Sequence, residues 1–140
     1  MNIVQHCAYL TLVSVLLVAC TNQPNEEIMQ GASAVQLRSY QTRAFDTADK
    51  LLMLRSVVAT LQDLGFIIDE ANVDLGSVTG TRVSGSQIRI TVVVRSRGDT
   101  QLLVRANAYL DLKPIETPEP YQDFFTSLEK SVFLTAHQVD

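Results

Sequence analysis

The chain has 140 residues, of which 46% are hydrophobic and 19% are charged, so it has room for one globular domain of ordinary composition. Its net charge of −4 argues against a nucleic-acid partner, because proteins that bind nucleic acids concentrate basic residues in a patch.

The first nineteen residues differ from the rest of the chain. Residues 1–19 contain no Asp, Glu, Lys or Arg, and about 13 of them, from Cys7 to Ala19, form an almost wholly apolar run. A helix that spans a bilayer needs ~20 apolar residues, so this run is too short. Its length and position predict a secretory signal peptide over residues 1–19.

A lipid-attachment motif follows directly. The sequence Leu17-Val18-Ala19-Cys20 resembles the lipobox of bacterial lipoproteins. The resemblance implies that signal peptidase recognises Leu17, Val18 and Ala19. It also implies that the Cys20 thiol is the lipid acceptor and that palmitate is among the acyl chains attached there. One departure is that only the α-amine and His6 supply positive charge before the apolar run. The alternative is an uncleaved anchor or a buried N-terminal helix.

The residues after Cys20 predict where in the cell envelope the protein is located. Thr21 stands where aspartate is the usual signal for retention in the inner membrane, so resemblance to that sorting rule implies the periplasmic face of the outer membrane. More than one acyl chain gives stable anchoring. Residues 20–35 are polar and contain Pro24 and Gly31, which predicts a lipidated, flexible tether before a periplasmic domain at 36–140.

The first half of that domain predicts a strand, a helix and two further strands. The first strand is expected over 37–45, and a helix over 47–64 has Asp46 as its N-cap and Gly65 as its C-cap. Its apolar stripe, with Val57 at the side, is Leu51, Leu54, Val58, Leu61 and Leu64. Strands are expected at 66–68 and 77–83, with a bulge at Gly80.

A long β-hairpin is the strongest strand prediction. Apolar residues alternate with polar ones over 88–95 and again over 102–110, around a turn at 97–99. We expect Val94 to lie opposite Leu102. Alternation places one row of side chains toward the core and the other row outward.

A second amphipathic helix closes the chain. Thr117 is its expected N-cap, with Pro118 at the first helical position. Its apolar stripe is Tyr121, Phe124, Phe125, Leu128, Val132 and Thr135. The order β-α-β-β-β-β-α predicts an α+β, two-layer sandwich in which both helices cover one face of a mostly antiparallel sheet.

Catalytic and metal-binding patterns are not found in the mature sequence. His6 and Cys7 leave with the signal peptide, Cys20 is lipidated, and His137 lies at a chain end. The carboxylates around Asp69 and Asp74 lack the spacing of a calcium loop and are expected to be solvated turn residues. We therefore expect no enzyme activity, no metal and no cofactor other than the covalent lipid on Cys20.

Arginines are concentrated in the expected sheet, where five of the eleven cations lie. Together with apolar residues on the outward positions of the hairpin, they define a candidate partner face, formed by Arg89, Val93, Arg95, Leu103, Arg105 and Tyr109. Such a mixture is typical of an interface core. The alternative is that these arginines line a solvated face and protect the sheet edges.

Part of the chain resembles a family of small proteobacterial lipoproteins. The resemblance covers roughly residues 39–82 and rests on 40–47 (YQTRAFDT), 54–69 (LRSVVATLQDLGFIID) and Leu75-Gly76. It implies no catalytic role. The order of helix, Leu-Gly-Phe, strand and Leu-Gly is also similar, at the level of fold, to lipoprotein modules of the outer-membrane β-barrel assembly machine, a likeness that does not specify function.

Two functions are compatible with these features. The first is a non-enzymatic lipoprotein, anchored by lipid, that docks onto a protein partner in an envelope assembly for secretion, efflux or outer-membrane assembly. The alternative is a binding module for a small envelope ligand, such as a lipid, a peptidoglycan fragment or a peptide, held between sheet and helices.

Overall fold

A computed structural model describes residues 33–137, with side chains as far as Phe133. It contains three helices and six strands, in an order that begins with a helix and ends with one. They are α2 (Ala34–Gln41), β1 (Thr42–Phe45), α3 (Lys50–Asp63), β2 (Ile67–Asn72), β3 (Ser77–Ser84), β4 (Ser86–Arg97), β5 (Gln101–Leu110), β6 (Lys113–Pro114) and α4 (Glu119–His137).

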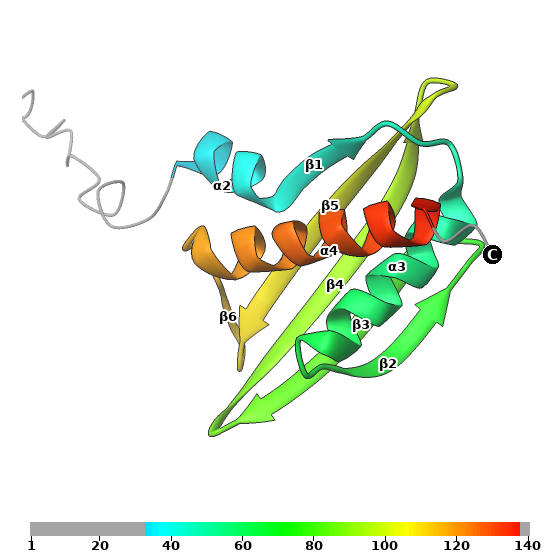
Figure 1. Cartoon of the computed structure of the whole chain (residues 1–140). Helices are drawn as coiled ribbons and strands as arrows, with labels where there is room; N and C mark the ends of the chain where they lie inside the picture. The colour runs from blue at the N-terminus through cyan, green and yellow to red at the C-terminus, as the bar shows by residue number, and fades with distance from the viewer. Residues whose placement is uncertain (1–32, 138–140) are drawn as a thin grey trace, which may run out of the picture. The chain divides into compact units, whose positions relative to one another are not determined.

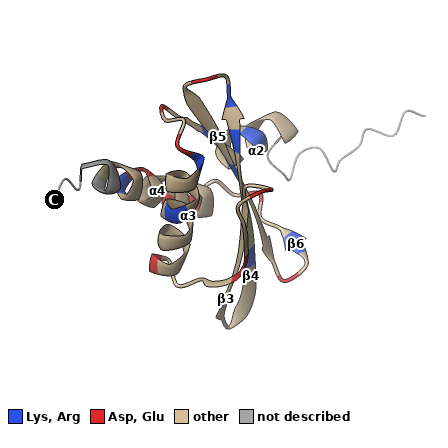
Figure 2. Cartoon of the chain, turned by 90° about the vertical axis from the view of Figure 1, so that its right-hand side faces the viewer, with Lys and Arg blue, Asp and Glu red and all other residues tan. Residues whose placement is uncertain are grey.

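The strands form one antiparallel sheet in the order β1-β5-β4-β3-β2, and β6 pairs with the end of β5 (Figure 1). Seen along the sheet, α3 and α4 lie on the same side (Figure 2). The predicted two-layer α+β sandwich is therefore confirmed. The helix α2 and the short strand β6 are additions to the predicted order.

The core lies between the sheet and the two long helices. Alternate residues of β4 and β5 are buried, and α4 contributes three fully buried aromatic side chains, Tyr121, Phe124 and Phe125. The sheet residues of this core are Ile90, Val92, Val94, Leu102, Val104, Ala106 and Ala108. The predicted alternation of the hairpin thus places the apolar row inward, as expected.

The register of the hairpin differs from the predicted one. Val94 lies opposite Val104, not Leu102, because the turn after Arg97 takes three residues before Gln101. The shift is two residues, and since side chains alternate with a period of two, it leaves every residue on its predicted face.

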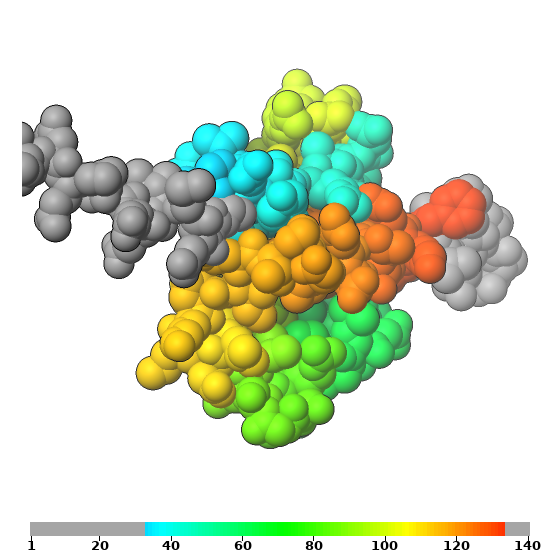
Figure 3. Space-filling model, turned by 90° about the vertical axis from the view of Figure 1, so that its left-hand side faces the viewer, coloured from blue at the N-terminus to red at the C-terminus, as the bar shows by residue number. Residues whose placement is uncertain are grey.

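The segment expected to start the first strand is helical up to Gln41. Ser33 caps α2 by accepting a hydrogen bond from the Gln36 N–H, while the Gln36 side chain accepts one from the Ser33 N–H. This capping box stabilises a helix start. Only Thr42–Phe45 is strand, and α2 begins two residues before the expected domain start. Figure 3 shows α2 beside the first half of α4.

The start of α3 lies three residues later than predicted. Its N-cap is Asp49, whose side chain accepts a hydrogen bond from the Leu52 N–H at 2.9 Å, and not Asp46. Its end agrees with the prediction, because Gly65 has a φ of 82°, the left-handed conformation of a helix C-cap.

The buried stripe of α3 is rotated toward α4 relative to the predicted one. Met53 and Thr60 are buried on that side, whereas Leu51 is 45% exposed and Val58 is only partly buried. The prediction was wrong about Leu51 because a sequence stripe does not show how two helices share one sheet face.

Two smaller predictions also need correction. Gly80 pairs regularly with Ile90, and the bulge lies on the neighbouring strand β2, where Asp69 is the extra residue between Ile68 and Glu70. The last helix starts at Glu119, and the carbonyl of Pro118, not Thr117, accepts its first backbone hydrogen bond, from Gln122.

Candidate functional site

The face of the sheet opposite α3 and α4 carries the predicted partner residues. Outward positions alternate with the buried ones along β4 and β5, and the six residues named from the sequence all occupy outward positions. We call this surface the outer face; its predicted residues are Arg89, Val93, Arg95, Leu103, Arg105 and Tyr109.

Cross-strand pairing brings these six residues together in three pairs. Arg95 lies opposite Leu103, Val93 opposite Arg105, and Arg89 opposite Tyr109. Val93 and Leu103 are half-buried, whereas the three arginines and Tyr109 are exposed. The two-residue shift in register therefore changes the predicted neighbours but keeps the predicted face.

Two depressions lie on the outer face. One, of about 330 Å³, is lined by Val93, Arg95, Leu103, Arg105 and Asn107. The other, of about 360 Å³, is bordered by Arg89, Thr91, Tyr109 and the turn after β5, where Leu112 is almost fully exposed. The face is thus uneven and offers recesses to a partner's side chains.

Other arginines of the described chain serve the fold. The guanidinium of Arg43 lies 4.9 Å from the centre of the Phe125 ring and pairs with Glu129 at 2.8 Å. Arg82, grouped with the sheet arginines from the sequence, points to the helix side instead. Its guanidinium lies 4.9 Å from the centre of the Phe66 ring and donates to the Leu64 carbonyl at 3.0 Å.

The residues of the lipoprotein-like signature have structural tasks. Gly65 turns the chain out of α3, and Phe66 is buried beneath the Arg82 guanidinium, which caps the last carbonyls of the helix. Gly76 has a φ of 69°, and its carbonyl accepts a hydrogen bond from the Val94 N–H at 2.8 Å. These contacts explain why the signature residues suit this fold without indicating a site.

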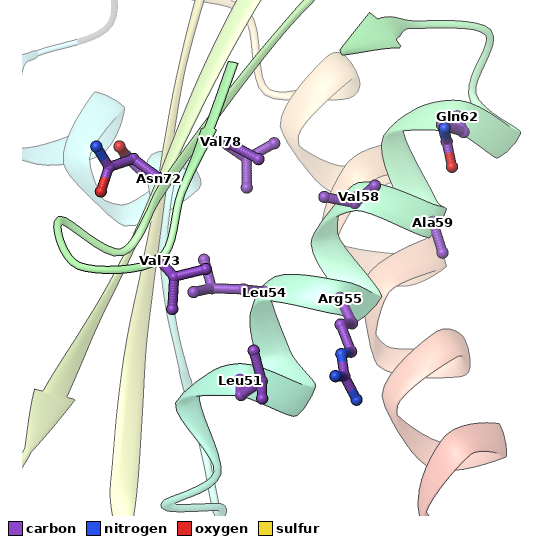
Figure 4. Close-up of a pocket in the computed structure, with 11 residues that line it drawn as sticks. Leu51, Leu54, Arg55, Val58, Ala59, Gln62, Asn72, Val73 and Val78 are labelled. Atoms are coloured by element: carbon purple, nitrogen blue, oxygen red, sulfur yellow. The ribbon is translucent and has the colours of Figure 1, made fainter. Parts of the chain in front are cut away.

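A groove lies on the helix side of the sheet, where the alternative function expects a ligand, but its residues and its place at the β2–β3 hairpin were not predicted from the sequence. It lies between α3 and the β2–β3 hairpin, has a volume of about 370 Å³, and receives Leu54, Val58, Val73 and Val78 (Figure 4). The other lining residues are Leu51, Arg55, Ala59, Gln62, Ala71, Asn72 and Ser77. Arg55 is the single charged residue in this lining.

The sequence feature that could have revealed this groove is the width of the apolar stripe of α3. Leu51 and Val58 belong to the predicted apolar stripe. Because α3 is rotated about its axis toward α4, these two side chains lie above the edge of the sheet and line the groove without being fully buried. An apolar stripe wider than its core contact leaves a hydrophobic surface available for binding.

Among the side chains that the structure describes, Ser33 to Phe133, no three His, Cys, Asp or Glu residues gather closely enough to hold a metal ion. No helix of this region has the length and apolarity needed to cross a membrane.

Several predicted features lie outside the described residues. They are the signal peptide, the recognition residues Leu17, Val18 and Ala19, the lipidated Cys20, and the tether as far as residue 32.

Comparison of the chain with models of known protein families gives no match, and comparison with curated protein sequences gives none either.

Proposed function

We propose that this protein is a non-enzymatic lipoprotein, anchored through Cys20 on the periplasmic side of the outer membrane, that docks onto an envelope assembly through the outer face. Secretion, efflux and outer-membrane assembly machineries are the candidate hosts. The anchor rests on the lipobox-like sequence Leu17–Cys20 after an apolar segment of about 13 residues.

The observation that carries the docking proposal is the composition of the outer face. Arg, Val, Leu and Tyr lie side by side on a sheet surface that neither α3 nor α4 covers. Interfaces are enriched in arginine and aromatic residues, whereas Lys, Glu, Asp and Ser are depleted there. The alternative is a solvated face whose arginines protect the sheet edges. Edge protection fits poorly, because β4 and β5 are interior strands, and the docking experiment below distinguishes a solvated face from an interface.

The anchor is tested with Cys20→Ser in the full-length protein. We expect this substitution to abolish incorporation of labelled palmitate and to leave an unprocessed precursor, because the serine hydroxyl does not replace the thiol as lipid acceptor. Wild-type protein expressed at the same level is the control. Palmitate label that persists in Cys20→Ser would refute the lipoprotein proposal.

Docking is tested with the double substitution Val93→Glu and Leu103→Glu. Both positions are half-buried on the outer face, so the isolated domain should remain folded, as measured by circular dichroism. Docking should be lost, because an interface would have to desolvate two unpaired carboxylates. The matched control is Gln62→Glu with Thr126→Glu, which adds two carboxylates at exposed positions of α3 and α4, on the other side of the sheet. A folded double variant that still co-purifies with its partner would refute docking through this face.

The groove between α3 and the β2–β3 hairpin favours a second candidate function. Its volume of about 370 Å³ and apolar lining suit an acyl chain or one apolar side chain of a peptide. A fluorescent fatty acid, titrated into the mature domain, discriminates between the two functions. Saturable binding that Val58→Gln removes would favour ligand binding, and its absence would favour docking.

A further inference from the structure

We propose that the partner of the outer face is a protein surface on which carboxylate side chains alternate with apolar ones. This inference rests on the proposed docking function and assigns the chemistry of the partner. It is carried by the arrangement of arginines on β4 and β5.

The first step concerns spacing. Arg95, Arg105 and Arg89 each lie opposite a valine, leucine or tyrosine, and the strand that holds the arginine changes between the first pair and the second. Residues opposite one another in an antiparallel pair have Cβ atoms about 4.5–5.5 Å apart. Each arginine stem therefore lies beside an apolar neighbour at about that spacing. The first two pairs are adjacent along the strands, and the polar pair Thr91 and Asn107 separates them from the third.

The second step concerns charge. None of the outward positions of β4 and β5 holds a carboxylate, and the outward residue Arg97 adds a fourth cation. Among the side chains described, as far as Phe133, the one ion pair joins Arg43 to Glu129, on the helix side of the sheet. Two carboxylates border the Arg89 end of the outer face, because Asp69 accepts a hydrogen bond from Thr81 opposite Arg89 and Asp111 lines the same depression as Arg89. Arg95 and Arg105 have no carboxylate among their cross-strand partners, and a partner that covers them has to supply the counter-charge.

The third step concerns the choice of cation. All four cations on the outward positions of β4 and β5 are arginines, whereas Lys50 and Lys130 lie on the helices and Lys113 on β6. Arginine presents a planar fork that binds a carboxylate through two parallel hydrogen bonds, and lysine does not. The outer face is thus suited to bind carboxylates whose position and orientation are fixed, as they are in a protein interface.

The fourth step separates a protein from a membrane. Phosphates of a lipid surface would also attract arginines, but that surface offers no apolar groups interleaved with the phosphates at the same depth. Val93, Leu103 and Tyr109 would then remain against polar headgroups. A protein surface with Asp or Glu beside apolar side chains matches both components of the outer face.

The test converts an arginine of the outer face into a cross-linking group. Full-length R95K and R105K keep the positive charge and add an amine, which a carbodiimide joins to a neighbouring carboxylate as an amide. The protein is cross-linked in membranes of its own cells, and mass spectrometry identifies the joined carboxylate. The native Lys130, which is exposed on α4 on the other side of the sheet and is present in every variant, is the internal control.

We expect R95K or R105K to form an amide with an Asp or Glu of another protein, with no such product from Lys130. Adding Val93→Gln to R105K, which makes the neighbouring position polar without placing a carboxylate beside residue 105, should weaken or remove the product. A photo-reactive amino acid at Asn107, between the arginine pairs, reports independently whether any protein covers the face. Photoproducts at Asn107 without amides at positions 95 and 105 would overturn the carboxylate inference and leave the docking function standing. Absence of both products would overturn both.

Two other partners are outcomes of the same experiment. Amides to Asp69 or Glu70 of a second copy would show that the outer face binds another copy of this protein. Photoproducts with phospholipid, together with sedimentation on phosphatidylglycerol vesicles that R89E, R95E and R105E abolish, would show that the face binds a membrane. Either outcome overturns the inference.

Discussion

At the scale of single residues, the Tyr121 hydroxyl connects four parts of the fold. It donates a hydrogen bond to the Ile115 carbonyl at 2.7 Å, and it lies 3.3 Å from both the Ala108 N–H and the Gln41 side-chain amide, which donate to it. These groups come from the loop after β6, from β5 and from α2. Because Tyr121 is fully buried, water does not replace these hydrogen bonds when the hydroxyl is removed.

Tyr121→Phe should therefore lower the free energy of unfolding by about 1–3 kcal/mol, since it leaves buried partners unsatisfied. Urea denaturation of the mature domain measures this change. The matched control is Tyr109→Phe, because the Tyr109 ring is 45% exposed on the outer face and its hydroxyl has access to water. Equal effects of the two substitutions would show that the buried hydroxyl does not stabilise the fold.

At the scale of elements, the start of α3 depends on which of two nearby aspartates caps the helix. Asp46 and Asp49 are both typical N-cap residues, and the sequence does not rank them. Asp46 accepts a hydrogen bond from the Gln101 side chain at 2.5 Å, which holds it beside β5. Asp49 is then the aspartate left to cap the helix.

Asp49→Ala should cost about 1 kcal/mol of stability, the usual effect of removing an N-cap side chain. Asp46→Ala removes an exposed hydrogen bond between side chains and should cost less than about 0.5 kcal/mol. Thermal melts of the two variants make the comparison. A larger loss for Asp46→Ala would mean that the helix starts where the sequence pattern placed it.

Elements are predicted well from the sequence where a regular alternation of side chains extends over many residues. The alternation in β4 and β5 places every candidate partner residue on the correct face, although the register is shifted by two residues. The helix α2 was missed because its first residues, as far as Val35, were assigned to the tether and the residues from Leu37 to the first strand. The signal that would have found it is the pair Ser33 and Gln36, spaced as in a capping box.

The candidate site is predicted in part for a physical reason. Outward residues of a sheet follow from alternation alone, so the outer face could be identified before the fold was known. The groove depends on the rotation of α3, which the packing of Met53 and Thr60 toward α4 decides. That packing involves residues far apart in the sequence, and a local pattern does not contain it.

At the scale of the whole molecule, the core depends on the last helix. Tyr121, Phe124, Phe125 and Leu128 are all fully or almost fully buried against the sheet. The other long helix, α3, packs toward β2, β3 and β4, and the short helix α2 adds only Leu37, Tyr40 and Gln41 to the cover over β1 and β5.

A chain that stops after Glu116 should therefore lack a cooperative thermal transition, because the inner sides of β5 and β1 lose their cover. A chain that stops after Phe133 keeps all the buried residues of α4 named above and should melt as one cooperative unit. Differential scanning calorimetry distinguishes the two. A cooperative transition in the shorter chain would show that the sheet folds without α4.

The pairing of β1 with β5 has a consequence for the order in which the protein folds. Phe45 at the start of the domain lies opposite Leu102, so the first strand of the sheet has no neighbour until more than half the domain has followed it. Contacts that close such long loops form late and slowly. The pairs β2–β3, β3–β4 and β4–β5 join neighbouring strands of the chain and can therefore form first. The attachment of β1 to β5 closes the sheet as one of the last steps of folding.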